Sequence, residues 1–299
     1  MRTLLVLPVL VVLPLSMVNG QGSAPMGPTI QRQMENARGR RPEPPAGPPG
    51  NAILIDTTTD LGRGIVAELS QENRDAVKFL TKAIEQEHGN AKNLALAYRF
   101  RGLAYKHLGR REEALRDFLE VIRIDPKFDL GYYNAGVIYN RTNRYQEAVT
   151  AMSRAIELRQ DDTGLARRLS ERGNAYFHLG QFDKAQSDLT GAVRREPPDP
   201  DALNNAAWFR ATCPDPRYRN GQEAIELATR ACNLDKWKDA DEIDTLAAAY
   251  AEAGNFAEAE RYELKALGVM EPGEALRSKF QERLALYRAK KPFRLVSGR

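Results

Sequence analysis

The sequence predicts an all-α protein in which pairs of helices repeat along most of the chain. In several segments a tyrosine comes three residues after a small residue, and Gly102, Gly136 and Gly173 mark this pattern at intervals of 34 and 37 residues. An alanine recurs in the apolar stretch that follows each segment, and Ala114 and Ala148 are again 34 residues apart. Repetition at this period predicts stacked helix pairs, each burying its apolar face against its neighbours.

Composition excludes some functions. The chain has 299 residues, of which 44 are Lys or Arg and 40 are Asp or Glu, so its net charge is +4. Both signs are interspersed, whereas a nucleic-acid-binding protein concentrates basic residues on one surface. We therefore expect no nucleic-acid partner. We interpret residues 290–299 as a basic, solubilising tail. The basic run at this end of the chain consists of Arg288, Lys290, Lys291 and Arg294.

The first twenty residues are typical of a secretory signal peptide. Residues 4–18 are apolar except for Ser16, and Gly20 offers a small residue for cleavage. The apolar stretch contains Pro8 and Pro14 and is shorter than the roughly 20 residues of a membrane-spanning helix. We expect export to the periplasm, the cell envelope or the medium, with no stable membrane span after cleavage. Retention of the segment stays open.

Residues 21–55 are expected to form a disordered linker. The stretch 21–50 contains seven prolines and five glycines and few aliphatic residues, so it cannot bury enough surface to offset its loss of entropy. Residues 56–94 are expected to form a degenerate repeat. Within it, residues 75–84 match the second helix of a repeat through Ala76, Leu80 and Ala83.

Five full units follow, at residues 95–128, 129–162, 166–199, 200–236 and 240–270. Their pattern of a small residue, Tyr, then Ala with an aromatic or aliphatic residue four positions on resembles the tetratricopeptide repeat (TPR). This resemblance covers roughly residues 60–270 and implies a right-handed superhelical solenoid. Pro126 and Pro197 close two units, as in that family, because proline cannot continue a helix.

The fourth unit departs from the pattern, and the chain continues beyond the fifth. Ala207 replaces the glycine, Arg210 replaces the tyrosine, and residues 213–221 form an inserted loop rich in turn formers. We expect Trp208, Phe209 or Tyr218 to fill the gap. Residues 271–289 are expected to form a capping helix whose apolar face closes the stack. That face consists of Leu276, Phe280, Leu284 and Tyr287.

We find no pattern of catalytic or metal-binding residues, and we expect no enzyme activity, metal or cofactor. His107 and His178 occupy equivalent places two repeats apart, which favours a role at helix ends over a shared metal site. Cys213 and Cys232 are expected to stay apart as buried thiols. The second lies ten residues into its helix, about 15 Å from the start.

Binding of another protein is the function that remains. In the resembling family the first helices line a concave groove, and we expect a peptide segment or partner surface to bind there. Two alternatives stay open: a substrate-presenting subunit of an envelope enzyme complex, and a self-associating structural repeat protein. The predicted groove residues flank the buried glycine and tyrosine of each unit. They are Arg99, Leu103, Lys106, Tyr133, Asn134, Val137, Arg167, Asn174, Phe177, Asn204 and Asn205.

Overall fold

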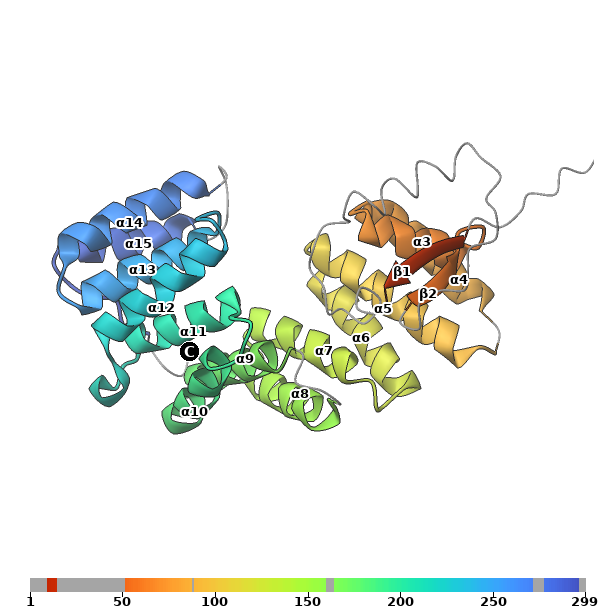
Figure 1. Ribbon diagram of the computed structural model, residues 1–299, viewed down its shortest axis with the longest axis horizontal. Helices are drawn as coiled ribbons and strands as arrows, with labels where there is room; N and C mark the ends of the chain where they lie inside the picture. Colours follow the sequence, from red (N-terminus) through yellow and green to blue (C-terminus); the bar gives the residue numbers. More distant parts are fainter. Residues whose placement is uncertain (1–9, 15–51, 88, 160–163, 271–276, 296–299) are drawn as a thin grey trace, which may run out of the picture. The chain divides into compact units, whose positions relative to one another are not determined.

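The computed structural model confirms the all-α prediction. It describes residues 10–14, 52–87, 89–159, 164–270 and 277–295. These residues form thirteen α-helices, α3 to α15, which pack in consecutive pairs, together with a short 3-10 helix and a two-stranded sheet (Figure 1). The chain divides into two compact units, Met1–Ile138 and Tyr139–Arg299. The predicted signal peptide and linker lie largely outside the described residues.

The first unit begins with a small sheet that the sequence did not predict. Strand β1 (Leu10–Pro14) lies within the predicted signal segment, and it pairs antiparallel with β2 (Ala52–Asp56), at the end of the predicted linker. A Cβ added at Gly62 would lie 1.9 Å from the carbonyl oxygen of Asp56, so only glycine lets the first helix approach the end of β2. Four helices complete the described pairs of this unit: α3 (Asp60–Leu69), α4 (Asn73–Gln86), α5 (Ala91–His107) and α6 (Arg111–Ile124).

Helix α7 (Asp129–Arg141) crosses from the first unit into the second, which contains the remaining helices. In the second unit the first helices of consecutive pairs contact each other, because α11 packs against both α9 and α13. The elements are α8 (Tyr145–Leu158), α9 (Leu165–His178), α10 (Phe182–Val193), α11 (Pro200–Thr212), η1 (Pro216–Tyr218), α12 (Gly221–Leu234), α13 (Ala240–Glu252), α14 (Phe256–Val269) and α15 (Arg277–Arg288).

The first helix of several pairs ends in the same way. Gly109, Gly180 and Gly254 adopt left-handed φ angles of 73°, 72° and 80° directly after α5, α9 and α13. At each of these ends the next residue's N–H bonds to the carbonyl of the repeat tyrosine, as Arg110 does to Tyr105 over 2.9 Å. Such bonds satisfy the last carbonyls of a helix and turn the chain into the next one. The recurrent turn therefore sets the antiparallel pairing.

Small residues bring the two helices of a pair together, as the sequence pattern indicated. A Cβ added at Gly102 would lie 3.0 Å from the ring of Phe118, and one added at Gly173 would lie 2.8 Å from Leu189. The segment 75–84 lies in α4, where Ala76 and Leu80 are fully buried. The apolar core thus runs through the contact between first and second helices.

The irregular fourth unit and the capping helix are packed by aromatic side chains. Phe209 and Tyr218 are 1% and 6% exposed, and their rings lie 5.8 Å apart, so they fill the space expected beside Arg210. In α15 the side chains of Phe280, Leu284 and Tyr287 are buried against the preceding helices, whereas Leu276 lies outside the described residues.

Candidate functional site

The predicted groove residues of the first unit lie on α5 and α7, and two of them are too buried for a partner to reach. Arg99 is 3% exposed, and its guanidinium lies 5.1 Å from the ring centre of Phe100 and 5.5 Å from that of Phe128. Burial lowers the pKa of Arg99 to about 10, although the charges of Glu68 and Asp129 act to raise it. Asn134 is also buried, and its amide donates to the Leu130 carbonyl over 2.8 Å. Neither side chain is presented to a ligand.

The other predicted residues of the first unit are half-buried. Leu103 packs at the edge of the core around Phe100. Lys106, Tyr133 and Val137 keep part of their surface exposed. Of the predicted residues on α5 and α7, these four keep surface that a partner can reach.

In the second unit the predicted residues lie on α9 and α11. Arg167 pairs with Asp199, the residue that caps α11, over 2.5 Å. Phe177 does not face a groove, because it is 1% exposed and its ring packs edge-on against Phe209 at 5.1 Å. Asn205 donates to the Ser170 hydroxyl over 2.9 Å and so joins α11 to α9. Asn174 and Asn204 are half-buried.

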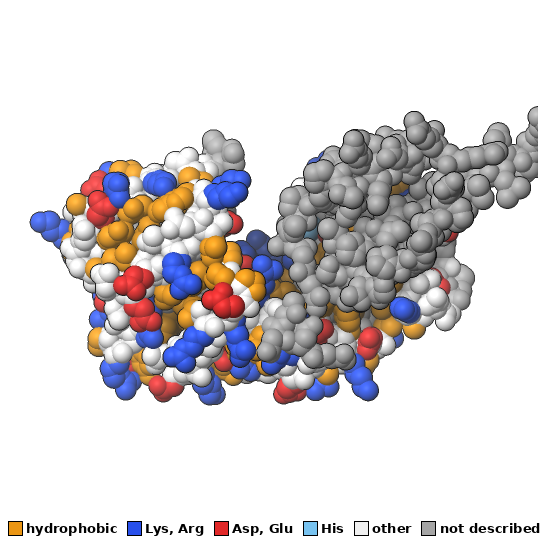
Figure 2. Space-filling view, in the orientation of Figure 1, with side chains coloured by type: hydrophobic (Ala, Val, Ile, Leu, Met, Phe, Trp, Pro, Cys, Tyr) orange, Lys and Arg blue, Asp and Glu red, His pale blue; other side chains and the backbone are white. Residues whose placement is uncertain are grey.

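We call the surface that α9, α11 and α13 present beside Asn174 and Asn204 the first-helix face. Asn204, Trp208 and Thr212 follow one another at intervals of four residues on α11, so they share one side of that helix. Around this unit acidic and basic side chains are interspersed over the visible surface (Figure 2). This interspersion agrees with the solvated surface expected from the sequence.

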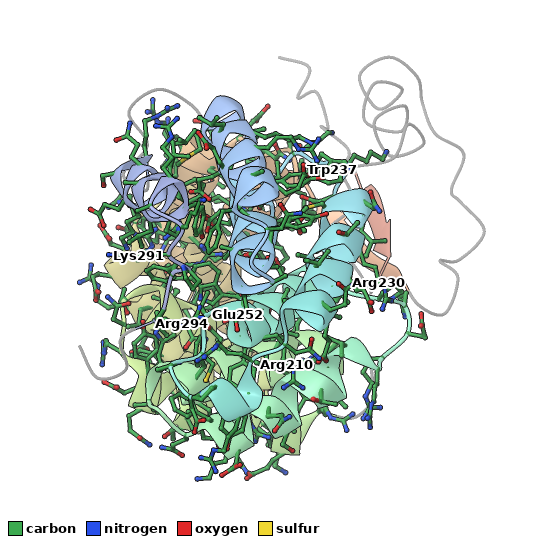
Figure 3. The ribbon with its side chains drawn as sticks, turned by 90° about the vertical axis from the view of Figure 1, so that its left-hand side faces the viewer. Arg210, Arg230, Trp237, Glu252, Lys291 and Arg294 are labelled. Carbon is green, nitrogen blue, oxygen red and sulfur yellow. The ribbon has the colours of Figure 1, made fainter. Side chains whose placement is uncertain are left out.

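The chain's own tail segment, residues 291–295, lies on the first-helix face. For residues 291–295 this finding corrects our interpretation of a solubilising tail at 290–299, whereas residues 296–299 lie outside the described residues. Phe293 lies 5.6 Å from Trp208 between ring centres, and the Leu295 N–H donates to the Thr212 carbonyl over 2.9 Å. Arg294 pairs with Glu252 at the end of α13, and Figure 3 shows the two side chains next to each other. The sequence did contain a signal for this packing, because Phe293 and Leu295 are apolar residues within a basic stretch.

A buried ionic group lies beneath the tail segment. Arg283 of α15 donates to Asp244 of α13 over 2.5 Å and lies 3.9 Å from Glu263 of α14. All three side chains are almost completely buried. Burial, together with the nearby Asp244 carboxylate, raises the pKa of Glu263. Arg283 therefore joins the capping helix to both helices of the last repeat.

The histidines and cysteines have structural surroundings. His178 stacks on Tyr145 with ring centres 4.3 Å apart, and burial lowers its pKa to about 4. His107 lies 3.4 Å from Glu68, in the last turn of α5. Cys213 and Cys232 are free and buried, as predicted, and burial raises the pKa of the Cys232 thiol to about 12.

In the part of the chain that the structure describes, no cluster of His, Cys, Asp or Glu is arranged to hold a metal ion. Among the same residues, no helix is long and apolar enough to cross a membrane.

Comparison with known proteins agrees with the repeated helix pairs. Models of the tetratricopeptide repeat match residues 95–128, 131–162, 170–216 and 240–271. Human "Tetratricopeptide repeat protein 6" is 32% identical over 57 residues, which are 19% of this chain and 11% of that protein. The chain thus spans only about a tenth of the length of this relative.

Two solved structures share the fold. The crystal structure of the APC/C hetero-tetramer Cut9-Hcn1 matches with a TM-score of 0.62 at 17% identity, covering 77% of this chain and 42% of that chain. The type IV pilus biogenesis factor PilW matches with a TM-score of 0.57 at 18% identity, covering 74% of this chain and 96% of that chain. The repeat matches and the consecutive helix pairs together identify this chain as a tetratricopeptide repeat protein.

Proposed function

We propose that the chain is a non-catalytic interaction scaffold, exported to the cell envelope, that binds a segment of a partner protein along the first helices of its repeats. The observation that supports binding most is the first-helix face of the second unit. There Asn174 and Asn204 are half-buried side chains. The Asn174 amide offers both a donor and an acceptor, whereas Oδ1 of Asn204 is itself buried, so Asn204 offers its NH2 group as a donor. Such groups bind the backbone of an extended segment without demanding a particular sequence.

The buried residues narrow the set that takes part. Arg99, Asn134 and Phe177 lack exposed surface, and Asn205 is engaged with Ser170. Binding in the second unit therefore rests on Asn174 and Asn204, with Arg167 at the rim. In the first unit it rests on Leu103, Lys106, Tyr133 and Val137.

Affinity capture from the source envelope, followed by calorimetric titration with the captured protein, tests this function. Replacing Asn174 and Asn204 by alanine should weaken binding about 5- to 150-fold, because each hydrogen bond contributes about 0.5–1.5 kcal/mol. The control is Arg154→Ala, which removes an exposed ion pair on the second helix α8. Equal affinity of the folded double variant and wild type would contradict binding through Asn174 and Asn204.

Export has a separate test. The apolar residues 4–18 and Gly20 support cleavage, which would also remove β1 from its pairing with β2. The mass of the protein purified from the envelope should correspond to loss of about twenty residues. A protein that keeps Met1 would contradict cleavage, and one found only in the cytosol would contradict export.

A further inference from the structure

The turn after α15 directs the tail segment away from the capping helix. Lys290 adopts a left-handed φ of 54°, and the N–H of Lys291 bonds to the Leu286 carbonyl over 2.9 Å. This pattern terminates a helix and turns the chain. Pro292 follows and keeps the next residues out of a helix. Residues 291–295 accordingly continue as a non-helical segment.

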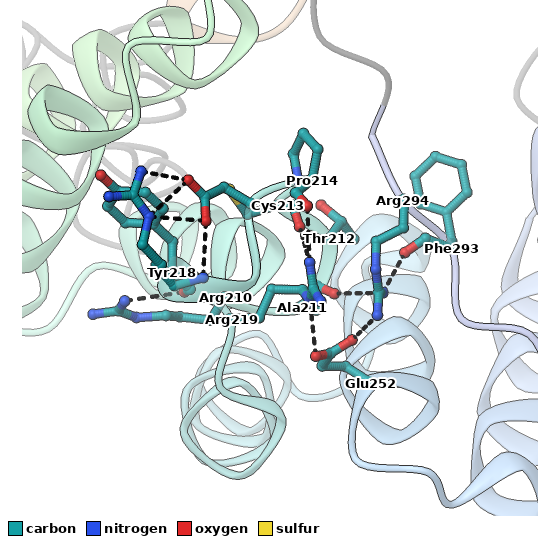
Figure 4. A network of polar contacts seen from close by, with 12 residues as sticks. Arg210, Ala211, Thr212, Cys213, Pro214, Tyr218, Arg219, Glu252, Phe293 and Arg294 are labelled. Atoms are coloured by element: carbon teal, nitrogen blue, oxygen red, sulfur yellow. Dashed lines mark hydrogen bonds and ion pairs between the residues drawn. The ribbon is translucent and has the colours of Figure 1, made fainter.

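The tail segment contacts the first-helix face as a bound peptide does. It combines an aromatic contact, an ion pair and backbone hydrogen bonds. Arg294 donates to the Ala211 carbonyl over 3.3 Å and pairs with Glu252 (Figure 4). The backbone N–H of Leu295 donates to the Thr212 carbonyl. These partners come from α11 and α13, beyond Asn204 on the same side of α11.

The receiving groups are held in place by contacts that do not involve the tail segment. Arg219 of the inserted loop pairs with Glu252 over 3.0 Å, and it donates to the carbonyls of Cys213 and Pro214 over 2.9 and 3.0 Å. Trp208 lies against the guanidinium of Arg283 at 5.5 Å. Because these contacts fix Glu252 and Trp208, the site would keep its shape if the tail segment left it.

The chemistry of the site selects an aromatic residue followed by an arginine. Trp208 offers a ring face, and Glu252 offers a carboxylate oxygen beside a backbone carbonyl, two acceptors that a guanidinium binds together. The Arg294 side chain is still 31% exposed, so it lies at the rim of the site. A competing segment can start to replace it from solvent.

We propose that Trp208, Glu252 and the Thr212 carbonyl form a peptide-binding site for an aromatic-arginine-aliphatic segment, and that the chain's own tail segment occupies this site as an intramolecular ligand. This proposal rests on the proposed function and adds the chemistry of the partner. A partner segment of this kind binds only by displacing residues 291–295.

The test uses the full chain with Trp237→Phe. The sequence has two tryptophans, so this substitution leaves Trp208 as the only fluorescent one. Figure 3 shows Trp237 well apart from Glu252 and Arg294. The tail is released by Phe293→Ala with Arg294→Ala. The probe is a capped hexapeptide, Lys-Lys-Pro-Phe-Arg-Leu, which copies residues 290–295. Binding is followed by Trp208 fluorescence.

The released variant should bind the hexapeptide at least about tenfold more tightly than the parent chain, in which the tail segment competes. Adding Glu252→Gln to the released variant, or replacing the peptide arginine by glutamate, should each weaken binding by about tenfold or more. Arg288→Ala is the matched control, because it removes a neighbouring positive charge whose ion pair with Glu260 lies outside the site. It should bind the peptide as weakly as the parent chain.

Equal affinity of the parent and released chains, or no binding by a folded released variant, would overturn the proposal. If the released variant does not fold, Arg294→Lys replaces it, since a lysine cannot bond to Ala211 and Glu252 as a guanidinium does. That variant should still bind the hexapeptide more tightly than the parent chain, and equal binding would again overturn the proposal.

A wild-type dimer that dissociates when the tail is released would assign the site to a second copy and contradict an intramolecular ligand. The partner protein could bind through Asn174 and Asn204 although no variant binds the hexapeptide. That result would overturn the peptide site at Trp208 and Glu252 but not the proposed function.

Discussion

The arginines of the regular repeats and those of the C-terminal end contact partners at very different distances along the chain. Arg101 and Arg172 each pair through two hydrogen bonds with an aspartate 16 residues later, Asp117 and Asp188. Each also donates to a hydroxyl of the preceding pair, at Thr81 or Ser153, 20 and 19 residues earlier. These clamps repeat because the helix pairs repeat.

The C-terminal arginines instead join segments distant in sequence. Arg283 reaches Asp244 across 39 residues, and Arg294 reaches Glu252 across 42 residues and Ala211 across 83. The comparison indicates that local contacts, reused in each unit, build the repeats, whereas single long-range contacts close the C-terminal end. The two kinds of contact should respond differently to substitution.

The largest effect is expected at the buried C-terminal arginine. Arg283→Ala leaves Asp244 buried without its partner, and removal of one member of a buried pair costs about 3–5 kcal/mol. Urea unfolding followed by circular dichroism measures the loss. The control is Arg288→Ala, whose exposed pair with Glu260 should contribute about 0–1 kcal/mol. Similar losses of unfolding free energy in both variants would contradict the expectation that the buried ion pair contributes more than the exposed one.

A smaller and matched effect is expected in the two repeat clamps. Arg101→Ala and Arg172→Ala each remove a pair of charge-assisted hydrogen bonds from half-buried sites, so each should lower the free energy of unfolding by about 1.5–3 kcal/mol. Because the arrangements are equivalent, the two losses should agree within about 0.5 kcal/mol. The same urea titration measures both. A large difference between them would mean that the units are not equivalent.

A further effect is a pH dependence in the first unit. Burial raises the pKa of the Glu68 carboxyl to about 7, although the nearby charges of Arg99 and Lys106 oppose this shift. The folded state therefore holds the proton more tightly than the unfolded state, whose carboxyl has its ordinary pKa of 4.5. This contribution to stability is complete below about pH 4.5 and is lost as the pH rises through about 7.

Glu68→Gln should remove this dependence, so the urea midpoint should fall less between about pH 5 and pH 8 than in wild type. Urea titrations at the two pH values measure this difference. His107 lies 3.4 Å from Glu68 and titrates in the same pH range, so both proteins carry His107→Gln in this comparison. The control Glu72→Gln changes an exposed carboxylate near the start of α4. A variant with the wild-type dependence would contradict the assignment to Glu68.

The sequence allowed the regular repeats to be predicted because their determinants are local. The spacing of Gly102, Gly136 and Gly173 gave the helix pairs, and the pattern in residues 75–84 matches the buried face of α4. The binding residues were harder to predict. The position of a residue along a helix predicts the side of the helix on which it lies. It does not predict whether a neighbouring helix takes up its hydrogen bonds, as Ser170 does for Asn205, or buries its side chain, as Phe209 does for Phe177.

The long-range contacts had no periodic signal in the sequence. The tail segment looked like a solvated basic end because Arg294 finds its partner only after α11 and α13 are folded side by side. The same holds for the pairing of β1 with β2 across more than thirty residues. Contacts that occur once cannot be recognised by comparing one repeat with another.

Hydrogen exchange at the Leu295 amide tests most directly the account in which the tail segment closes the C-terminal end. This N–H donates to the Thr212 carbonyl over 2.9 Å. In the wild-type chain we expect exchange at least about tenfold slower than at an unprotected amide, and Glu252→Gln should restore fast exchange by releasing Arg294. Fast exchange of Leu295 in the folded wild type would contradict the account.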